Sequence, residues 1–180
     1  MLLTLCCFTV AAQTIQDETL KTQLLKDWMR AKNYTREYLD AMPADHYTFR
    51  PTDSVRTFGQ QMLHLAFANV ACAMIATGYH DSAVLLVLLN PNIERSPKAG
   101  NKDSVTRYVN MSYDYMMTAI RNFDFSKLNE IVKQHTAGGD RSEMRFAWLM
   151  KGFEHQTHTR GQCAVYLRLS GILPPTEKLF

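Results

Sequence analysis

Three histidines of this chain have a spacing that suits metal binding. His155 and His158 lie three positions apart, one helical turn, within a segment of helical periodicity. His64 lies on another such segment, among small or polar neighbours that leave room beside its ring. Imidazole nitrogen is the commonest protein ligand of divalent transition metals, and three imidazoles leave a coordination position open for water. We therefore take these three residues as candidate metal ligands, although a histidine on an apolar face is more often a hydrogen-bonded core residue.

Two polar residues near these histidines are candidates for supporting the ligands rather than the ion. Gln162 falls on the helical face of His155 and could hydrogen-bond a ligand imidazole, and Thr159 lies one turn after His155. The remaining histidines occur in loop-like stretches and are expected to be solvated: His46, His80 and His135. The sequence shows neither a Ser–His–Asp arrangement nor a phosphate-binding glycine loop, so metal-assisted chemistry is the class it favours.

Four segments with helical periodicity would position these side chains. In each of them apolar residues recur every three or four positions, the pattern of one buried stripe. The four segments span residues 17–42, 57–77, 103–123 and 141–170. Pro43 ends the first segment, Thr57 and Gln60 predict a capping box for the second, and Gly78 permits its exit.

The connections between these segments differ in length. Residues 79–101 form a long connection that permits a crossover and contains the short apolar run 83–89. Residues 124–140 form a second irregular link, with one short helix expected around 127–133. No strand-like alternation of any length is visible. The sequence therefore predicts an all-α fold, a four-helix bundle with a long crossover connection.

Composition limits the classes of protein that remain. The 180 residues are 46% hydrophobic and 21% charged, ordinary values for one globular domain. The net charge of +3 is too small and too evenly spread to indicate a nucleic-acid surface. No apolar run reaches the length of about 18 residues that a membrane-spanning helix needs.

The first residues have a different character from the rest. Residues 2–12 read LLTLCCFTVAA, an uncharged apolar run that ends in small residues, although no basic residue precedes it. This pattern predicts a secretory signal peptide over residues 1–12, cut after Ala12, and hence a periplasmic or otherwise exported domain of residues 13–180. The alternative is an apolar helical extension in a cytoplasmic protein. Cleavage would leave Cys72 and Cys163, which are expected to be small core residues rather than a disulfide framework.

Several motifs resemble those of the DinB family, the YfiT-like group of four-helix bundles regarded as metalloenzymes. Residues 155–162, HQTHTRGQ, followed by 165–169 and by GILPP at 171–175, resemble its closing motif. Residues 58–66, FGQQMLHLA, resemble its second-helix motif, and residues 41–51 resemble its first inter-helix loop. The resemblance covers nearly all of residues 13–180.

The resemblance implies one divalent ion, nickel or zinc, held by three histidines. His64 and His155 match the family ligands directly, but the third ligand position holds Thr159, whose hydroxyl is a poor ligand for such metals. Either His158 takes that role or the site is weakened. Glu154 and His158 offer another pair one turn apart, but Glu154 points further from the inferred core face.

Two further residues belong to the same motif, and the family suggests functions for the whole chain. Gln162 is expected to contact a ligand, whereas Arg160 points away from that face, where an ion pair with a neighbouring helix or subunit is expected. The resemblance implies a metal-dependent enzyme, a thiol S-transferase or a hydrolase, acting on a small molecule. The alternatives are a metal-depleted protein that binds a small ligand and a homodimeric interaction protein of the same fold.

Overall fold

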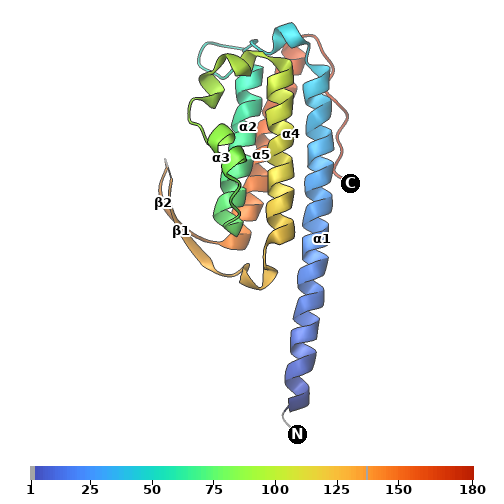
Figure 1. Cartoon of the computed structure of the whole chain (residues 1–180). Coiled ribbons are helices and arrows are strands. Elements are labelled where there is room, and N and C mark those ends of the chain that lie inside the picture. The colour runs from blue at the N-terminus through green and yellow to red at the C-terminus, as the bar shows by residue number, and fades with distance from the viewer. Residues whose placement is uncertain (1–2, 137) are drawn as a thin grey trace.

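The computed structural model describes the backbone of residues 3–136 and 138–180, and the side chains of residues 16–135 and 138–180. Within these ranges the fold is all-α (Figure 1). Four long helices form the bundle: α1 (Leu3–Ala41), α2 (Phe58–Thr77), α4 (Lys102–Asn122) and α5 (Arg145–Leu169). Short elements join them: η1 (Ala44–His46), α3 (Ser82–Leu88), η2 (Ile93–Arg95), η3 (Pro97–Gly100) and η4 (Phe125–Lys127).

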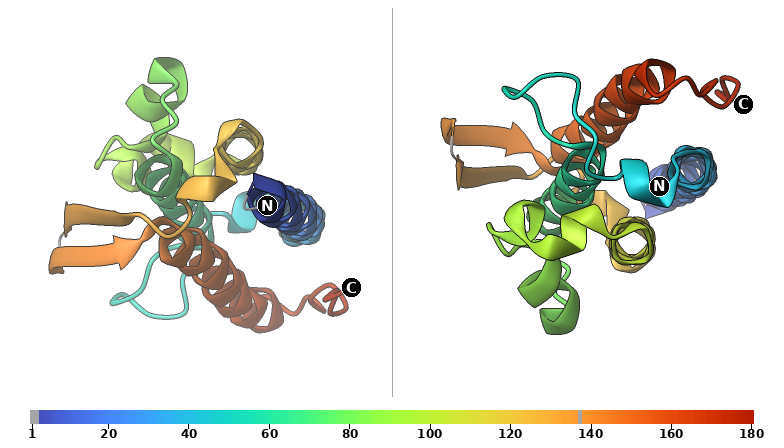
Figure 2. Two further views of the ribbon diagram at one scale, coloured as in Figure 1. Left: turned by 90° about the horizontal axis from the view of Figure 1, so that it is seen from below. Right: turned by 90° about the horizontal axis from the view of Figure 1, so that it is seen from above.

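The order of the helices around the bundle differs from their order in the chain. Seen along its axis, α1 lies beside α4 and α5, and α2 lies beside the same two helices (Figure 2). The consecutive helices α1 and α2 therefore stand on opposite sides of the bundle. The long connection that contains α3, η2 and η3 returns the chain to the end where α2 began, so α2 and α4 run parallel (Figure 1). This confirms the predicted crossover.

Local signals in the sequence fix the ends of α2. The Thr57 side chain accepts a hydrogen bond from the amide of Gln60 at 3.3 Å, and the Gln60 side chain accepts one from the amide of Thr57 at 2.9 Å. This is the predicted capping box, which satisfies two amides that the first turn leaves without helical partners. At the other end Gly78 adopts φ 73°, a left-handed conformation that glycine takes without strain. These ends set which residues of α2 face α5.

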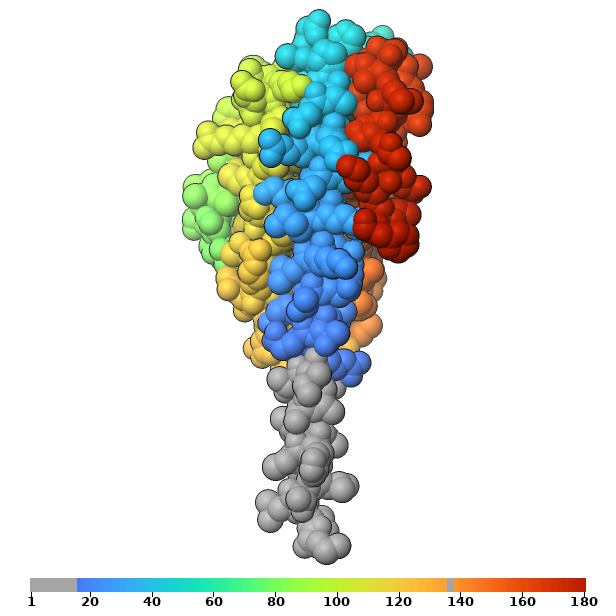
Figure 3. Space-filling model, turned by 90° about the vertical axis from the view of Figure 1, so that its right-hand side faces the viewer, coloured from blue at the N-terminus to red at the C-terminus, as the bar shows by residue number. Residues whose placement is uncertain are grey.

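Aromatic residues of α1 fill the core as the apolar stripe predicts. Trp28 is fully buried and makes edge-on contacts with Tyr113 of α4 and Phe153 of α5. Other predicted stripe residues are buried as well: Leu24, Ala31, Tyr34 and Tyr38. The segment after α5 lies along α1 (Figure 3), where the Arg30 guanidinium donates a 2.7 Å hydrogen bond to the carbonyl oxygen of Lys178.

The link between α4 and α5 corrects three expectations. Strand β1 (Ile131–Thr136) pairs antiparallel with β2 (Gly139–Met144), so the prediction that the chain has no strand is wrong. The hairpin also occupies the start of the predicted fourth helix, and α5 begins at Arg145 instead of about residue 141. The short helix expected around 127–133 is only the 3-10 turn η4. Both strands are mostly exposed and polar, which explains why their sequence lacks an apolar alternation.

The N-terminal predictions concern residues about which the structure says little. Residues 1 and 2 lie outside the described residues, as do the side chains of 3–15, so the cut after Ala12 stays a prediction. Within the described part of the chain, no helix has the length and apolar character needed to cross a membrane. Cys72 and Cys163 are free thiols, half-buried and buried respectively.

Candidate metal and ligand site

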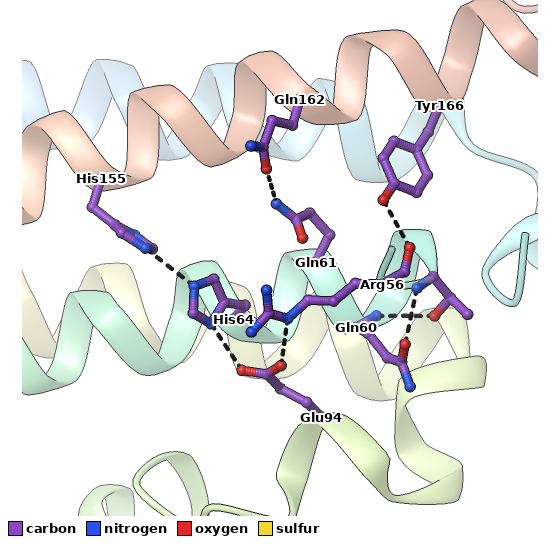
Figure 4. A network of polar contacts seen from close by, with 9 residues as sticks. Arg56, Gln60, Gln61, His64, Glu94, His155, Gln162 and Tyr166 are labelled. Atoms are coloured by element: carbon purple, nitrogen blue, oxygen red, sulfur yellow. Dashed lines mark hydrogen bonds and ion pairs between the residues drawn. The ribbon is translucent and has the colours of Figure 1, made fainter. Parts of the chain in front are cut away.

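Two of the three candidate ligands meet between α2 and α5. The Nε2 atom of His64 lies 3.3 Å from the Nε2 atom of His155, and the two rings face each other edge-on (Figure 4). His64 comes from the middle of α2 and His155 from the middle of α5, which run antiparallel and pack closely. The structure thus brings together residues 91 positions apart in the chain.

A carboxylate holds His64 from the opposite side of its ring. Glu94, in η2, places Oε1 2.9 Å from Nδ1 of His64, and its Oε2 accepts a 2.6 Å hydrogen bond from Nε of Arg56 (Figure 4). Burial would raise the pKa of Glu94, but the hydrogen bonds from His64 and Arg56 outweigh it and lower that pKa. An ionised Glu94 favours a proton on Nδ1 of His64, which turns the Nε2 lone pair toward His155.

His155 is held as a neutral imidazole. Burial, followed by repulsion from His64, lowers the pKa of His155 from 6.5 to about 4. Its Nδ1 atom is buried and has no hydrogen-bond partner among the described residues. With a proton on Nδ1, the Nε2 atom of His155 would face His64 with a lone pair of its own.

The separation of the two Nε2 atoms fits a metal ion between them. Zinc binds imidazole nitrogen at about 2.0–2.1 Å in tetrahedral geometry, which places two ligand nitrogens roughly 3.3 Å apart. The observed 3.3 Å matches that separation. Glu94 supplies the carboxylate that metal-bound histidines commonly have on their other nitrogen. His64 and His155 therefore fit two positions of a metal site.

The third candidate ligand does not join this pair. His158 is exposed, and its Nε2 atom accepts a 2.9 Å hydrogen bond from the Gln162 side-chain amide. The buried residues of α5 centre roughly 80° around the helix from His155, whereas His158 lies roughly 60° to the other side. Thr159 is 1% exposed and points into the bundle. Among the described residues, no cluster of three His, Cys, Asp or Glu side chains is positioned to hold a metal.

Two glutamines bridge α2 and α5 beside the histidine pair. Gln61 donates a hydrogen bond to the side-chain carbonyl of Gln162 (Figure 4). The Gln162 amide in turn donates to His158. Gln162 therefore contacts a candidate ligand, but that ligand is His158 rather than His155. Gln61 is not among the predicted site residues, although it falls on the same face of α2 as His64.

An open pocket of about 860 Å³ is lined by Glu94, the carboxylate that holds His64, although neither His64 nor His155 lines it. Its lining includes Gln61, Gln162 and Glu94, together with Arg56 and Arg95. The hydroxyl of Tyr166 donates a 2.7 Å hydrogen bond to the carbonyl oxygen of Arg56, which holds the backbone of that arginine in place. A small molecule in this pocket would meet the carboxylate that orients His64.

Arg160 has a structural role that differs from the predicted ion pair. It is 4% exposed, and its Nη1 atom donates hydrogen bonds to Gln156 at 2.6 Å and to Thr35 of α1 at 3.2 Å. Its guanidinium lies 4.5 Å from the ring centre of Tyr34. The contact with a neighbouring helix is as expected, but hydrogen bonds and an aromatic ring take the place of a carboxylate among the described residues.

Comparisons with known proteins agree with this architecture. A DinB-like protein from Bacillus cereus ATCC 10987 superposes with a TM-score of 0.68 at 18% identity, covering 86% of this chain and 95% of that one. A DinB-like protein from Bacillus subtilis gives 0.64 at 17% identity, covering 88% and 96%. At these identities the likeness concerns the fold alone. No curated protein matches the chain. Residues 15–178 match the model of the DinB family, and the chain therefore belongs to that family.

Proposed function

We propose that this protein is a metal-dependent enzyme that holds one divalent transition-metal ion, nickel or zinc, between α2 and α5. The observation that supports the proposal is the 3.3 Å separation of the Nε2 atoms of His64 and His155. His155 is neutral near pH 7 because its pKa is about 4, and a neutral imidazole is the form that binds metal.

His158 is the proposed third ligand. It lies one turn from His155 and would have to give up its hydrogen bond with Gln162 and change rotamer to reach the ion. Such a rearrangement weakens binding relative to a site with three preorganised imidazoles. We therefore expect moderate metal affinity.

The surrounding residues would support acid–base chemistry at this point. A bound divalent ion would polarise a substrate oxygen or sulfur and ease the loss of its proton, as a thiol S-transferase or a hydrolase requires. Glu94 holds the His64 ring and fixes its tautomer, and Arg56 holds Glu94 through Nε. Gln61 and Gln162 present amide groups at the edge of the pocket that would receive the substrate.

Metal titration tests the proposal directly. Chelator-stripped protein is titrated with zinc and nickel at pH 7 by calorimetry, for the wild type and four variants. His155→Ala should abolish binding, His158→Ala should weaken it, and Thr159→His should tighten it at least tenfold by restoring the family ligand. His135→Ala is the matched control, because His135 is exposed on the hairpin. A wild type and a Thr159→His variant that both fail to bind either ion would refute the proposal.

A second candidate function follows from Thr159. If the site has lost its third ligand, the pocket and its polar lining would serve a protein that binds a small ligand without a metal. In that case the calorimetry shows no metal binding by the wild type, whereas Thr159→His restores it. A homodimeric interaction protein is the remaining hypothesis; Val165 and Leu169 are about half exposed on α5 and would lie in such an interface. Sedimentation of the wild type tests it.

A further inference from the structure

The charged side chains around the pocket are not all paired. Asp53 forms an ion pair with Arg50 at 3.3 Å, and Glu94 forms one with Arg56 at 2.6 Å. Arg95 also lines the pocket, yet it forms no ion pair with any described residue. The four charged lining residues balance in formal charge, and Arg95 is the one of them without an ion-pair partner among the described residues.

Arg56 uses only part of its hydrogen-bonding capacity. It contacts Glu94 through Nε, and its two terminal nitrogens have no hydrogen bond within the described part of the chain. Because Arg56 and His64 bond the two oxygens of one carboxylate, the guanidinium and the imidazole lie side by side (Figure 4). The hydrogen bond from Tyr166 holds the backbone of Arg56 in place. Arg56, one of the lining residues, thus keeps two terminal nitrogens available to an anion, and its guanidinium lies beside His64.

A carboxylate fits these donors better than other anions. The planar guanidinium accepts the two oxygens of a carboxylate in a bidentate arrangement, which adds direction to the charge interaction. The one guanidinium of the lining without an ion-pair partner, that of Arg95, can compensate a monoanion, whereas a phosphate dianion would remain partly uncompensated. The other walls include Val55, Val165 and Pro51, so an apolar body attached to the carboxylate would also find contacts.

We infer that the pocket binds small amphiphilic carboxylates, with the carboxylate on the terminal nitrogens of Arg56, assisted by Arg95, and the rest of the molecule extending along the apolar wall. This substrate class rests on the proposed function, because the metal site would decide which part of the bound molecule reacts. The anion site itself depends only on the two arginines.

Binding of phenylacetate to metal-free protein tests the inference, and phenylacetamide is the uncharged analogue used as the control. Removing the metal ensures that a carboxylate cannot bind by coordinating an ion. Affinities come from nitrogen–proton NMR titrations that follow the arginine Nε–H and glutamine amide signals. Arg56→Gln and Arg95→Gln remove the two donors, and Arg36→Gln is the matched control, since Arg36 is exposed on α1 and pairs with Asp40. Zinc affinity is measured on the same samples.

The expected result is saturable binding of phenylacetate, at least tenfold tighter than that of phenylacetamide. Arg56→Gln should weaken it at least tenfold and Arg95→Gln about threefold, as expected for charge-assisted hydrogen bonds at partly exposed sites, and Arg36→Gln should leave it unchanged. The inference is overturned if the protein binds phenylacetate and phenylacetamide equally well, or binds neither. It is also overturned if neither Arg56→Gln nor Arg95→Gln changes the affinity for phenylacetate. Metal titration separates the two proposals. A protein that binds phenylacetate through Arg56, but binds neither zinc nor nickel as the wild type or as Thr159→His, refutes the metal proposal alone.

Discussion

Replacing Gly59 by alanine is expected to destabilise the protein by about 3 kcal/mol, near the upper end of the usual range for overpacking. A Cβ atom at this position would overlap the carbonyl oxygen of Ala99, and would lie 3.0 Å from the Ala99 carbonyl carbon and 3.3 Å from the carbonyl oxygen of Tyr47. All three neighbours are backbone atoms, so no side chain can rotate away. Relief requires η3 to move off α2. The close approach to the Tyr47 carbonyl also strains the 3.0 Å hydrogen bond that this oxygen accepts from the Gly59 amide.

This displacement should also reach the histidine pair, because η3 follows η2 and η2 carries Glu94. Urea unfolding followed by circular dichroism gives the stability change, and zinc titration shows whether the site has loosened. Gly161→Ala is the matched control. It lies inside α5 where an added Cβ meets nothing within 4 Å, so it should stabilise the protein by about 0.5–1 kcal/mol through helix propensity. A Gly59→Ala protein within about 0.5 kcal/mol of the wild type would refute the packing argument.

Three further changes have expected outcomes. In metal-free protein, the contribution of His155 to stability should fall as the pH drops from 6.5 toward 4, because the unfolded chain protonates His155 throughout this window and the native state does not. After allowance for solvent screening this loss is about 1–2 kcal/mol, and His155→Gln should remove it from the pH profile. Arg160→Ala should cost roughly 2–4 kcal/mol, because it removes a buried group that binds Thr35 and Gln156, whereas Arg168→Ala on the exposed face should change urea stability little. The exported protein in its native host should begin at Gln13, and N-terminal sequencing that finds Met1 on a cytoplasmic protein would contradict the predicted cut.

The long helices and their caps are predictable because their signals are local. Each depends on residues within a few positions of one another, as with Thr57 and Gln60 at the start of α2. The hairpin lacks such a signal. Its strands are mostly exposed, and Val132 is the strand residue that packs against the core, so no apolar alternation marks them in the sequence. Helix α3 has only seven residues, too few for its period to stand out from an apolar run.

In the candidate site, too, the residues with local sequence signals are predictable and the others are not. The pairing of His64 with His155 follows from two helical faces and a family motif. Glu94 could not be assigned from its position, because it lies in an irregular connection whose path depends on the packing of η2 against α2. The sequence predicts that His158 shares the inward face of the helix with His155, because it does not show which part of α5 is most deeply buried. The buried sector turns out to be centred on residues such as Cys163 and Gly152, away from His158.

The placement of α1 opposite α2 has a consequence for the order in which the chain can fold. The apolar stripe of α1, with Trp28 at its centre, packs on α4 and α5. During synthesis this stripe therefore stays without its native partners until α4 has left the ribosome, and the cross-section closes only when α5 follows. Contacts between distant segments slow folding relative to a bundle whose neighbours are consecutive, and exposed apolar surface invites aggregation meanwhile. A nascent chain of this topology is therefore expected to expose apolar surface for longer than a bundle whose consecutive helices pack together.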